Sequence, residues 1–115
     1  MSFVAVATIT PQTMRASISA TLREVSAHGL SVELSEEDLV FLSDGARVTV
    51  AFSGFGERLE LPGQVAWQLR HHRAAARLGV KLLVDAAPGR MRLAFAKTLL
   101  KLARSGRRLG TGSDL

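Results

Sequence analysis

Apolar side chains recur at every second position along most of this chain, and this spacing restricts the fold more than any other feature of the sequence. In one stretch, serine, threonine and arginine alternate with Ala16, Ile18, Ala20 and Leu22. Because successive side chains of an extended strand point to opposite faces, this alternation indicates strands with one buried face. Similar patterns predict six strands, at residues 3–9, 16–23, 30–34, 48–52, 59–69 and 76–84.

Six short strands of this kind favour a closed barrel, since closure leaves no edge strand open to aggregation. We therefore expect a mainly β protein: a six-stranded antiparallel β-barrel with a C-terminal α-helix. Its interior is predicted to contain Val50, Val65 and Trp67. Pro62 lacks the N–H that a strand ladder uses, so Pro62 and Gly63 predict a bulge or bend in the fifth strand.

Two segments lack the alternation and indicate helices. Ser35 precedes three acidic residues and is predicted to cap a short helical turn. The second segment, residues 87–104, has Pro88 in its first turn and an apolar stripe at Met91, Phe95, Leu99 and Leu102. We expect residues 1–105 to form one domain, with a flexible basic tail at residues 106–115.

The C-terminal helix has a second apolar row beside the first, formed by Leu93, Ala96 and Leu100. A barrel shields only one side of a helix, so this second row is predicted to be partly exposed and available to a partner or to a second copy of the chain. The predicted partner-binding residues are Leu93, Lys97, Leu100, Lys101 and Arg104.

Charge divides the chain into an acidic part and a basic part. Residues 1–69 have a net charge of −4 and residues 70–115 have a net charge of +9. A basic surface of this kind meets an anionic partner or is simply solvated. Nucleic acid is one such partner, but aromatic residues make up only 5% of the chain, so the base-stacking platform of a single-strand binder is absent.

Composition favours a protein of the cytoplasm. The chain has no cysteine, which excludes disulfides and cysteine-based zinc sites. Its longest apolar stretches are far shorter than the roughly 20 residues of a membrane-spanning helix. At 115 residues, 47% of them hydrophobic, the chain can bury a core of its own. We expect a cytoplasmic location and no membrane span.

Catalytic and metal-binding patterns are weak. The three histidines are His28 and the neighbours His71 and His72, and no acid or nucleophile stands at a spacing that would orient them. Adjacent histidines in an arginine-rich loop are usually just solvated. We therefore expect no enzyme activity, no metal site and no cofactor.

A tight turn is predicted between the second and third strands, at Ser26-Ala27-His28-Gly29. Glycine adopts a positive φ without strain and serine hydrogen-bonds to nearby backbone, so these residues suit a hairpin. Together with Glu24 they give Glu24-x-Ser26-x-x-Gly29, which resembles the Asp/Asn-x-Ser-x-x-Gly ligand motif of PilZ domains. Any all-β protein could carry such a turn by itself.

The order of the later elements strengthens the resemblance. The stretch Gly63-Gln64-Val65-Ala66-Trp67 is followed by a loop, then by Gly79-Val80-Lys81-Leu82, then by a helix, and PilZ domains show a similar series. The resemblance covers roughly residues 3–100. It implies a role in bacterial cyclic di-GMP signalling, with Glu24, Ser26, His28 and Gly29 as the ligand-binding residues.

The sequence also departs from the PilZ pattern. The family's first ligand motif, Arg-x-x-x-Arg, precedes the first strand, where only Met1 and Ser2 stand here, and Glu24 replaces Asp or Asn. Arg15 and Arg23, which we expect in the second strand, do not substitute for that motif. We predict a PilZ-like module that acts through protein contacts with little or no direct ligand binding; the alternatives are a genuine cyclic di-GMP receptor and a nucleic-acid-binding surface.

Overall fold

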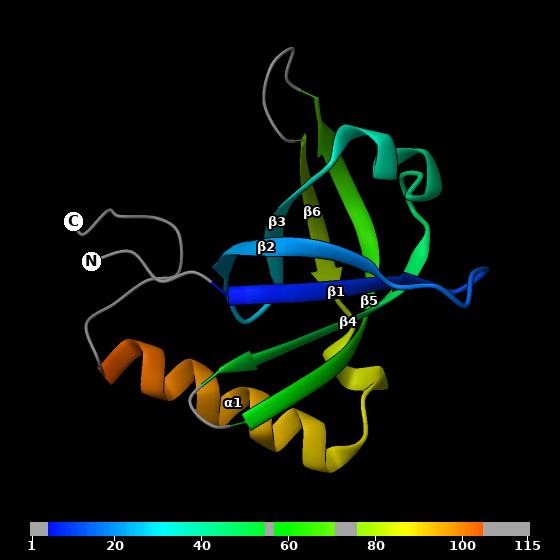
Figure 1. The fold of residues 1–115 in the computed structure, drawn as a ribbon. Helices are drawn as coiled ribbons and strands as arrows, with labels where there is room; N and C mark the ends of the chain where they lie inside the picture. The colour runs from blue at the N-terminus through cyan, green and yellow to red at the C-terminus, as the bar shows by residue number, and fades with distance from the viewer. Residues whose placement is uncertain (1–4, 55–56, 71–75, 105–115) are drawn as a thin grey trace.

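Six antiparallel strands close into a barrel, as the alternation predicts (Figure 1). The computed structural model describes residues 5–54, 57–70 and 76–104. Around the barrel the order is β1-β2-β3-β6-β5-β4, and β1 pairs with β4 to complete the ring. The strands are β1 (Ala5–Pro11), β2 (Ile18–Val25), β3 (Gly29–Leu34), β4 (Arg47–Gly54), β5 (Glu57–Leu69) and β6 (Ala76–Leu82).

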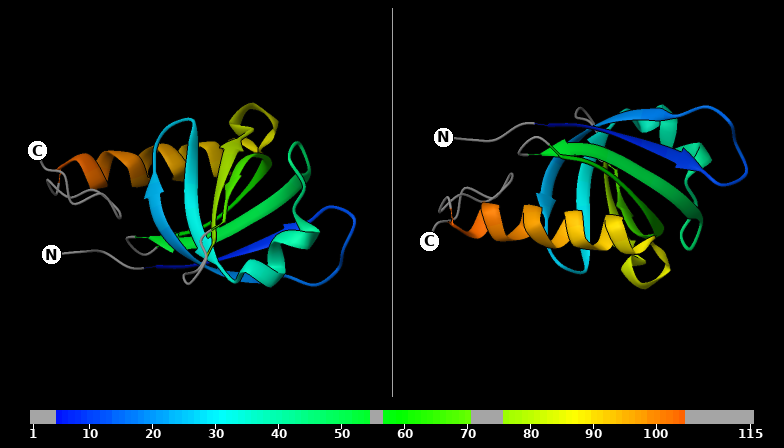
Figure 2. Two further views of the ribbon diagram at one scale, coloured as in Figure 1. Left: turned by 90° about the horizontal axis from the view of Figure 1, so that it is seen from above. Right: turned by 90° about the horizontal axis from the view of Figure 1, so that it is seen from below.

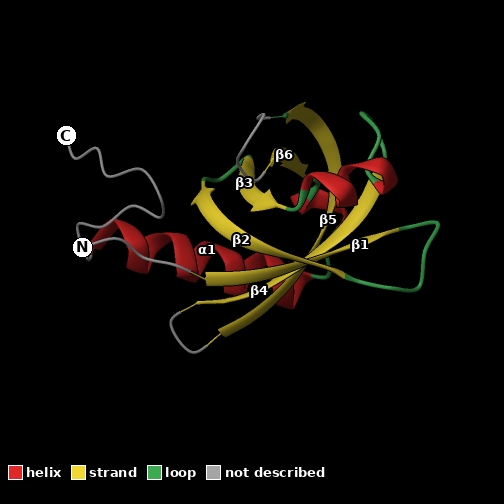
Figure 3. Cartoon of the chain, turned by 45° about the horizontal axis from the view of Figure 1, so that its top comes forward, coloured by secondary structure: helices red, strands yellow, loops and turns green. Residues whose placement is uncertain are grey.

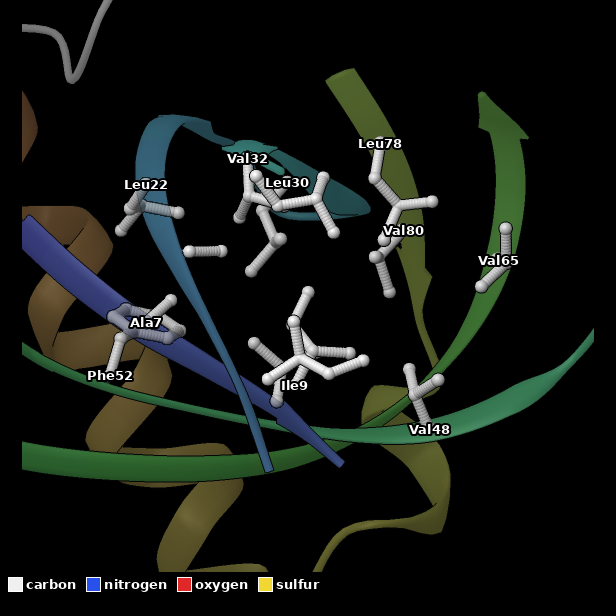
Figure 4. Packing of buried hydrophobic residues seen from close by; sticks show 14 of the residues in the cluster. Ala7, Ile9, Leu22, Leu30, Val32, Val48, Phe52, Val65, Leu78 and Val80 are labelled. Carbon is white, nitrogen blue, oxygen red and sulfur yellow. The ribbon is translucent and has the colours of Figure 1, made fainter. Parts of the chain in front are cut away.

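The barrel interior is filled by the alternating apolar side chains of all six strands. Figure 4 shows how they converge from opposite walls. Of the residues expected inside, Val50 is fully buried and Val65 is 2% exposed. Other contributors are Ile9, Leu22, Val32, Phe52, Leu61, Leu78 and Val80. Packing of these side chains, which removes apolar surface from water, is the main source of stability.

Helix α1 (Gly89–Arg104) lies along the outside of the barrel, as the two views of Figure 2 show. Its barrel side carries Phe95, 3% exposed, and Thr98, 2% exposed, whose hydroxyl donates a hydrogen bond to the Ala94 carbonyl. Met91 and Leu99 of the predicted stripe pack partly against the same core. The side chain of Leu102, the fourth member of that stripe, lies outside the described residues.

Two short 3-10 helices lie between these elements: η1 (Glu36–Phe41) and η2 (Val84–Ala86). Ser35 caps η1 as expected, and its hydroxyl accepts a hydrogen bond from the Glu37 N–H. The end of β5 holds η1 in place, because Gln68 donates a hydrogen bond to the Leu42 carbonyl. Figure 3 shows η1 beside one end of the barrel and separate from α1.

Two strands each contain one extra residue, and these bulges decide which side chains face outward. In β2 the register moves from Leu22 opposite Val32 to Glu24 opposite Ser31, which leaves Arg23 as the extra residue. In β5 the register moves from Val65 opposite Val80 to Trp67 opposite Gly79, which leaves Ala66 as the extra residue. A bulge reverses the inward and outward alternation beyond it.

The expectation that Trp67 lies inside the barrel is therefore wrong. Leu61 and Val65 point inward, but the extra residue at Ala66 turns Trp67 and Leu69 outward, and these two side chains are 44% and 50% exposed. The bulge expected at Pro62 and Gly63 is also misplaced. Pro62 stays in regular register opposite Thr49, so the irregularity comes four residues later.

Several boundaries differ from those expected. Strand β1 extends to Pro11, and β2 begins only at Ile18, so Arg15 and Ala16 belong to the preceding turn. Strand β6 ends at Leu82, before η2. The predicted tail at residues 106–115 and the histidines at positions 71 and 72 lie outside the described residues. Within the part of the chain that the structure describes, no helix has the length and apolar character to cross a membrane.

Leucines on the two faces of β5 should differ sharply in their contribution to stability. Leu61 is fully buried, so Leu61→Ala should lower the free energy of unfolding by about 2–5 kcal/mol. The matched change Leu69→Ala, at a half-exposed leucine of the same strand, should cost less than about 1 kcal/mol. Denaturant titration measures both values, and equal losses would contradict the bulge at Ala66.

Candidate functional site

The turn between β2 and β3 is held by hydrogen bonds among its own residues. The Ser26 N–H donates to the Gly29 carbonyl at 2.8 Å, and the Ser26 hydroxyl donates to the same oxygen at 3.3 Å. The His28 N–H in turn donates to the Ser26 hydroxyl oxygen at 3.3 Å. This arrangement confirms the predicted role of serine as a turn-forming residue.

Gly29 is needed for close packing of two strands and not for the positive φ that the turn was expected to require. Among the described glycines, Gly45, with a φ of 82°, is the one with a positive φ. At Gly29 a Cβ atom would lie 2.6 Å from the Val80 carbonyl oxygen of β6. The glycine therefore allows β3 and β6 to approach closely beside the turn, whereas the positive φ belongs to the Asp44-Gly45 turn.

An open groove of about 420 Å³ lies on the outer surface of the barrel next to this turn. It crosses β2, β3, β6 and β5, which are consecutive neighbours in the sheet. Its walls are formed by Glu24, Val25, Ser26, Gly29, Leu30, Ser31, Ala66, Trp67, Val80 and Lys81. The two bulges lie at opposite sides of the groove, which explains why both Glu24 and Trp67 reach it.

Trp67 forms one wall of the groove by covering a glycine. A Cβ at Gly79 would collide with the indole ring, so the ring lies directly on the backbone of β6. Gly79 pairs with Trp67 on one side and with Ser31 on the other. Ser31 is only 5% exposed, and the indole is left 44% exposed to solvent.

Polar groups in the groove are few and balanced in charge. The Ser31 hydroxyl donates to the Glu24 carboxylate at 3.4 Å. Among the described lining residues, Glu24 supplies one negative charge and Lys81 one positive charge. The formal charge of these described lining residues is therefore zero, and no guanidinium is among them.

The structure brings together three of the four ligand-binding residues expected from the sequence. Glu24, Ser26 and Gly29 line the groove. His28 instead lines a neighbouring hollow of about 640 Å³ with Arg47, Lys81 and Asp85. Lys81 belongs to both, because it stands beside Gly29 in the register of β3 and β6.

Sequence reasoning missed Trp67, Ser31 and Lys81 as groove residues. It missed Trp67 because a regular alternation placed that side chain inside, and the small residues Ala66 and Gly79 were the signal that could have revealed the bulge and the covered backbone.

Next to the groove, the two carboxylate oxygens of Glu33 form ion pairs with two arginines. Glu33 Oε1 lies 3.7 Å from Arg23 Nη1, and Glu33 Oε2 lies 3.9 Å from Arg77 Nε. Arg73 and Arg77 have the spacing Arg-x-x-x-Arg, but Arg73 lies outside the described residues.

The second predicted surface, on α1, has the exposure expected of it. Leu93 and Leu100 are 58% and 52% exposed, and Lys97, Lys101 and Arg104 are exposed beside them. These residues lie opposite the helix face that packs on the barrel. Within the described residues, no group of three or more metal-ligating side chains is placed to hold a metal ion.

Comparison with known proteins identifies relatives of this architecture. The model of the PilZ domain family matches residues 3–95. The PilZ domain of CeSA from a cellulose-synthesising bacterium superposes with a TM-score of 0.65 at 14% identity, covering 90% of this chain and 96% of that one. The PilZ domain of YcgR from Escherichia coli, solved with cyclic di-GMP, also gives a TM-score of 0.65 at 14% identity, covering 88% and 83%. No curated protein sequence matches the chain.

The contact between Trp67 and Gly79 predicts a strong coupling between two substitutions. Gly79→Ala should destabilise the barrel by about 1–3 kcal/mol, because the new methyl group collides with the indole. In a Trp67→Ala background, Gly79→Ala should lower the free energy of unfolding much less. The coupling energy between the two substitutions should therefore be about 1 kcal/mol or more. Denaturant titration of the four proteins measures the cycle. Additive losses would show that the ring does not rest on this backbone.

Proposed function

Because the chain belongs to the PilZ domain family, we propose that it is a regulatory module of bacterial cyclic di-GMP signalling that acts through contacts with a partner protein. It works in the cytoplasm, has no catalytic activity of its own, and binds cyclic di-GMP little or not at all. The partner contacts involve Leu93, Lys97, Leu100, Lys101 and Arg104 of α1.

The charge of the groove is the observation that carries this proposal. Cyclic di-GMP has two phosphates, and such a ligand is best held by guanidinium groups that donate paired hydrogen bonds and stack on bases. Among the described residues that line it, the groove instead contains one ammonium group, on Lys81, and one carboxylate, on Glu24. This carboxylate repels a dianion and offsets the attraction of Lys81.

The hydroxyl groups of the groove are also engaged with the protein. Ser26 donates its hydroxyl proton to the Gly29 carbonyl, and Ser31 donates its own to Glu24. A phosphate that accepted a hydrogen bond from either serine would have to replace an existing acceptor. The gain in free energy from such an exchange is small, because one hydrogen bond is made for each one broken.

A genuine cyclic di-GMP receptor is the second candidate function. In its favour, the turn from Ser26 to Gly29 is fully formed, an open groove lies beside it, and the similarly folded domain of YcgR was solved with cyclic di-GMP. In a receptor, Glu24, Ser26, His28 and Gly29 would contact the ligand. Direct binding measurements separate the two functions.

Calorimetry with cyclic di-GMP should show no saturable binding at low-micromolar ligand and moderate salt. As a positive control, a variant with Arg-x-x-x-Arg inserted ahead of Phe3 should gain measurable affinity, because the inserted guanidiniums supply the missing phosphate contacts. Changing Gly29→Val in that variant should remove the gain. A stoichiometric micromolar interaction with the unmodified chain would overturn the proposal and establish the receptor.

The outer face of α1 should tolerate charge without loss of the fold. Leu93→Glu with Leu100→Glu should change the free energy of unfolding by less than about 1 kcal/mol, because both side chains are more than half exposed. Phe95→Ala, on the barrel side of the same helix, should cost about 3–5 kcal/mol. Unfolding of the double glutamate variant would show that the leucines belong to the core and cannot serve a partner.

A further inference from the structure

The exposed face of α1 has the spacing of a coiled-coil seam. Its apolar residues are Leu93, Ala96, Leu100 and Ala103, which follow one another at intervals of three, four and three. All four are exposed, with Leu93 at 58% and Leu100 at 52%. Apolar residues at this spacing form the a and d positions through which two helices pack.

The barrel leaves this seam uncovered, because it packs against the opposite side of the helix. Phe95 and Thr98 are 3% and 2% exposed and lie two residues beyond Leu93 and Ala96 respectively. In an α-helix a separation of two residues turns the side chain by about 200°. Figure 2 shows α1 against the barrel on one side, with no other described element on the other.

Cations flank the seam at the positions that select partners. If Leu93 and Leu100 are a residues, then Arg92 is at g, and Lys97 and Arg104 are at e. The helix contains five cations and no carboxylate. None of the three ion pairs found among the described residues involves a cation of α1.

The cations near the start of the helix are unfavourable for the helix itself. Arg90 and Arg92 stand close to its N-terminus, where the positive end of the macrodipole repels them, and the first turn contains no acidic residue. These two cations therefore lower the stability of the helix slightly, and acidic side chains of a partner would offset that effect.

A second copy of the chain does not fit this seam. In a parallel pair Arg92 of one helix would face Lys97 of the other, and in an antiparallel pair e positions face e positions, again with like charges. An anionic membrane is also a poor match, since the seam has two leucines and two alanines and lacks the aromatic residues typical of helices that insert at an interface.

We propose that α1 docks an amphipathic α-helix of the partner protein, with apolar residues facing Leu93, Ala96, Leu100 and Ala103 and acidic residues facing Arg92, Lys97 and Arg104. This inference rests on the proposed function, to which it adds the chemistry of the partner. Alanines at d allow the partner helix to approach closely, and the leucines at a supply most of the buried apolar area.

Two labelled synthetic helical peptides test this inference with the full chain. Both have apolar a and d positions; one has glutamate at every e and g position and the other has lysine there. Fluorescence anisotropy should show binding of the glutamate peptide and none of the lysine peptide. Leu93→Glu with Leu100→Glu should abolish that binding, because it places carboxylates in the seam.

Charge reversal provides the sharper test. Lys97→Glu with Arg104→Glu should lower the affinity for the glutamate peptide by about tenfold or more. The same change should allow the lysine peptide to bind, since charges at e and g set partner choice. The control variant Arg15→Glu with Arg58→Glu makes the same change in net charge at exposed positions outside α1, and should leave both peptides unchanged. Circular dichroism confirms that each variant is folded.

Several results would overturn the inference: no binding of the glutamate peptide, a preference unchanged by reversal at Lys97 and Arg104, or an equal effect of the Arg15 and Arg58 control. A dimer in sedimentation that the leucine variant dissociates would make a second copy the occupant. Binding to vesicles of anionic phospholipid that is lost in the leucine variant would make a membrane the occupant. Saturable cyclic di-GMP binding would refute the proposed function without affecting the peptide measurements.

Discussion

One extra residue in each of two strands, Arg23 in β2 and Ala66 in β5, determines what this barrel presents to solvent. Side chains alternate strictly along a strand, so an insertion turns every residue beyond it to the other face. The bulge in β2 puts Glu24 on the outside, and the bulge in β5 does the same for Trp67. Without them Glu24 would point into the core and the groove would have neither its carboxylate nor its aromatic wall.

Close backbone approach is the second constraint, and it depends on two glycines. Gly29 lets β3 lie against the Val80 carbonyl, and Gly79 gives the Trp67 indole a flat backbone to cover. Both contacts lie in the same part of the sheet, between β3, β6 and β5. The groove is thus built from paired strands, and the hydroxyls of Ser26 and Ser31 donate to acceptors of the protein.

This construction separates the molecule into two surfaces with different chemistry. Among the described lining residues of the groove, Glu24 and Lys81 balance in charge and the hydroxyls of Ser26 and Ser31 donate to acceptors of the protein, which is the basis of our proposal of little or no ligand binding. The outer face of α1 combines exposed leucines with cations that have no carboxylate on the same helix. A shared architecture with ligand-binding domains therefore need not imply a shared use of the groove, because function depends on the side chains that a fold displays.

The sequence by itself determined the barrel, the helix and their core, because alternation with period two and an apolar stripe with helical spacing are local signals that burial amplifies. It also located Ser26 and Gly29 at a turn and Leu93 and Leu100 on an open face. It did not place Trp67, since regular alternation puts that side chain inside, whereas the single inserted residue at Ala66 reverses the strand's faces. Only the tertiary structure decided that Gly29 serves close packing, that Ser31 and Lys81 join Glu24 in one groove, and that His28 lies in the neighbouring hollow, because pairing between distant strands sets these neighbours.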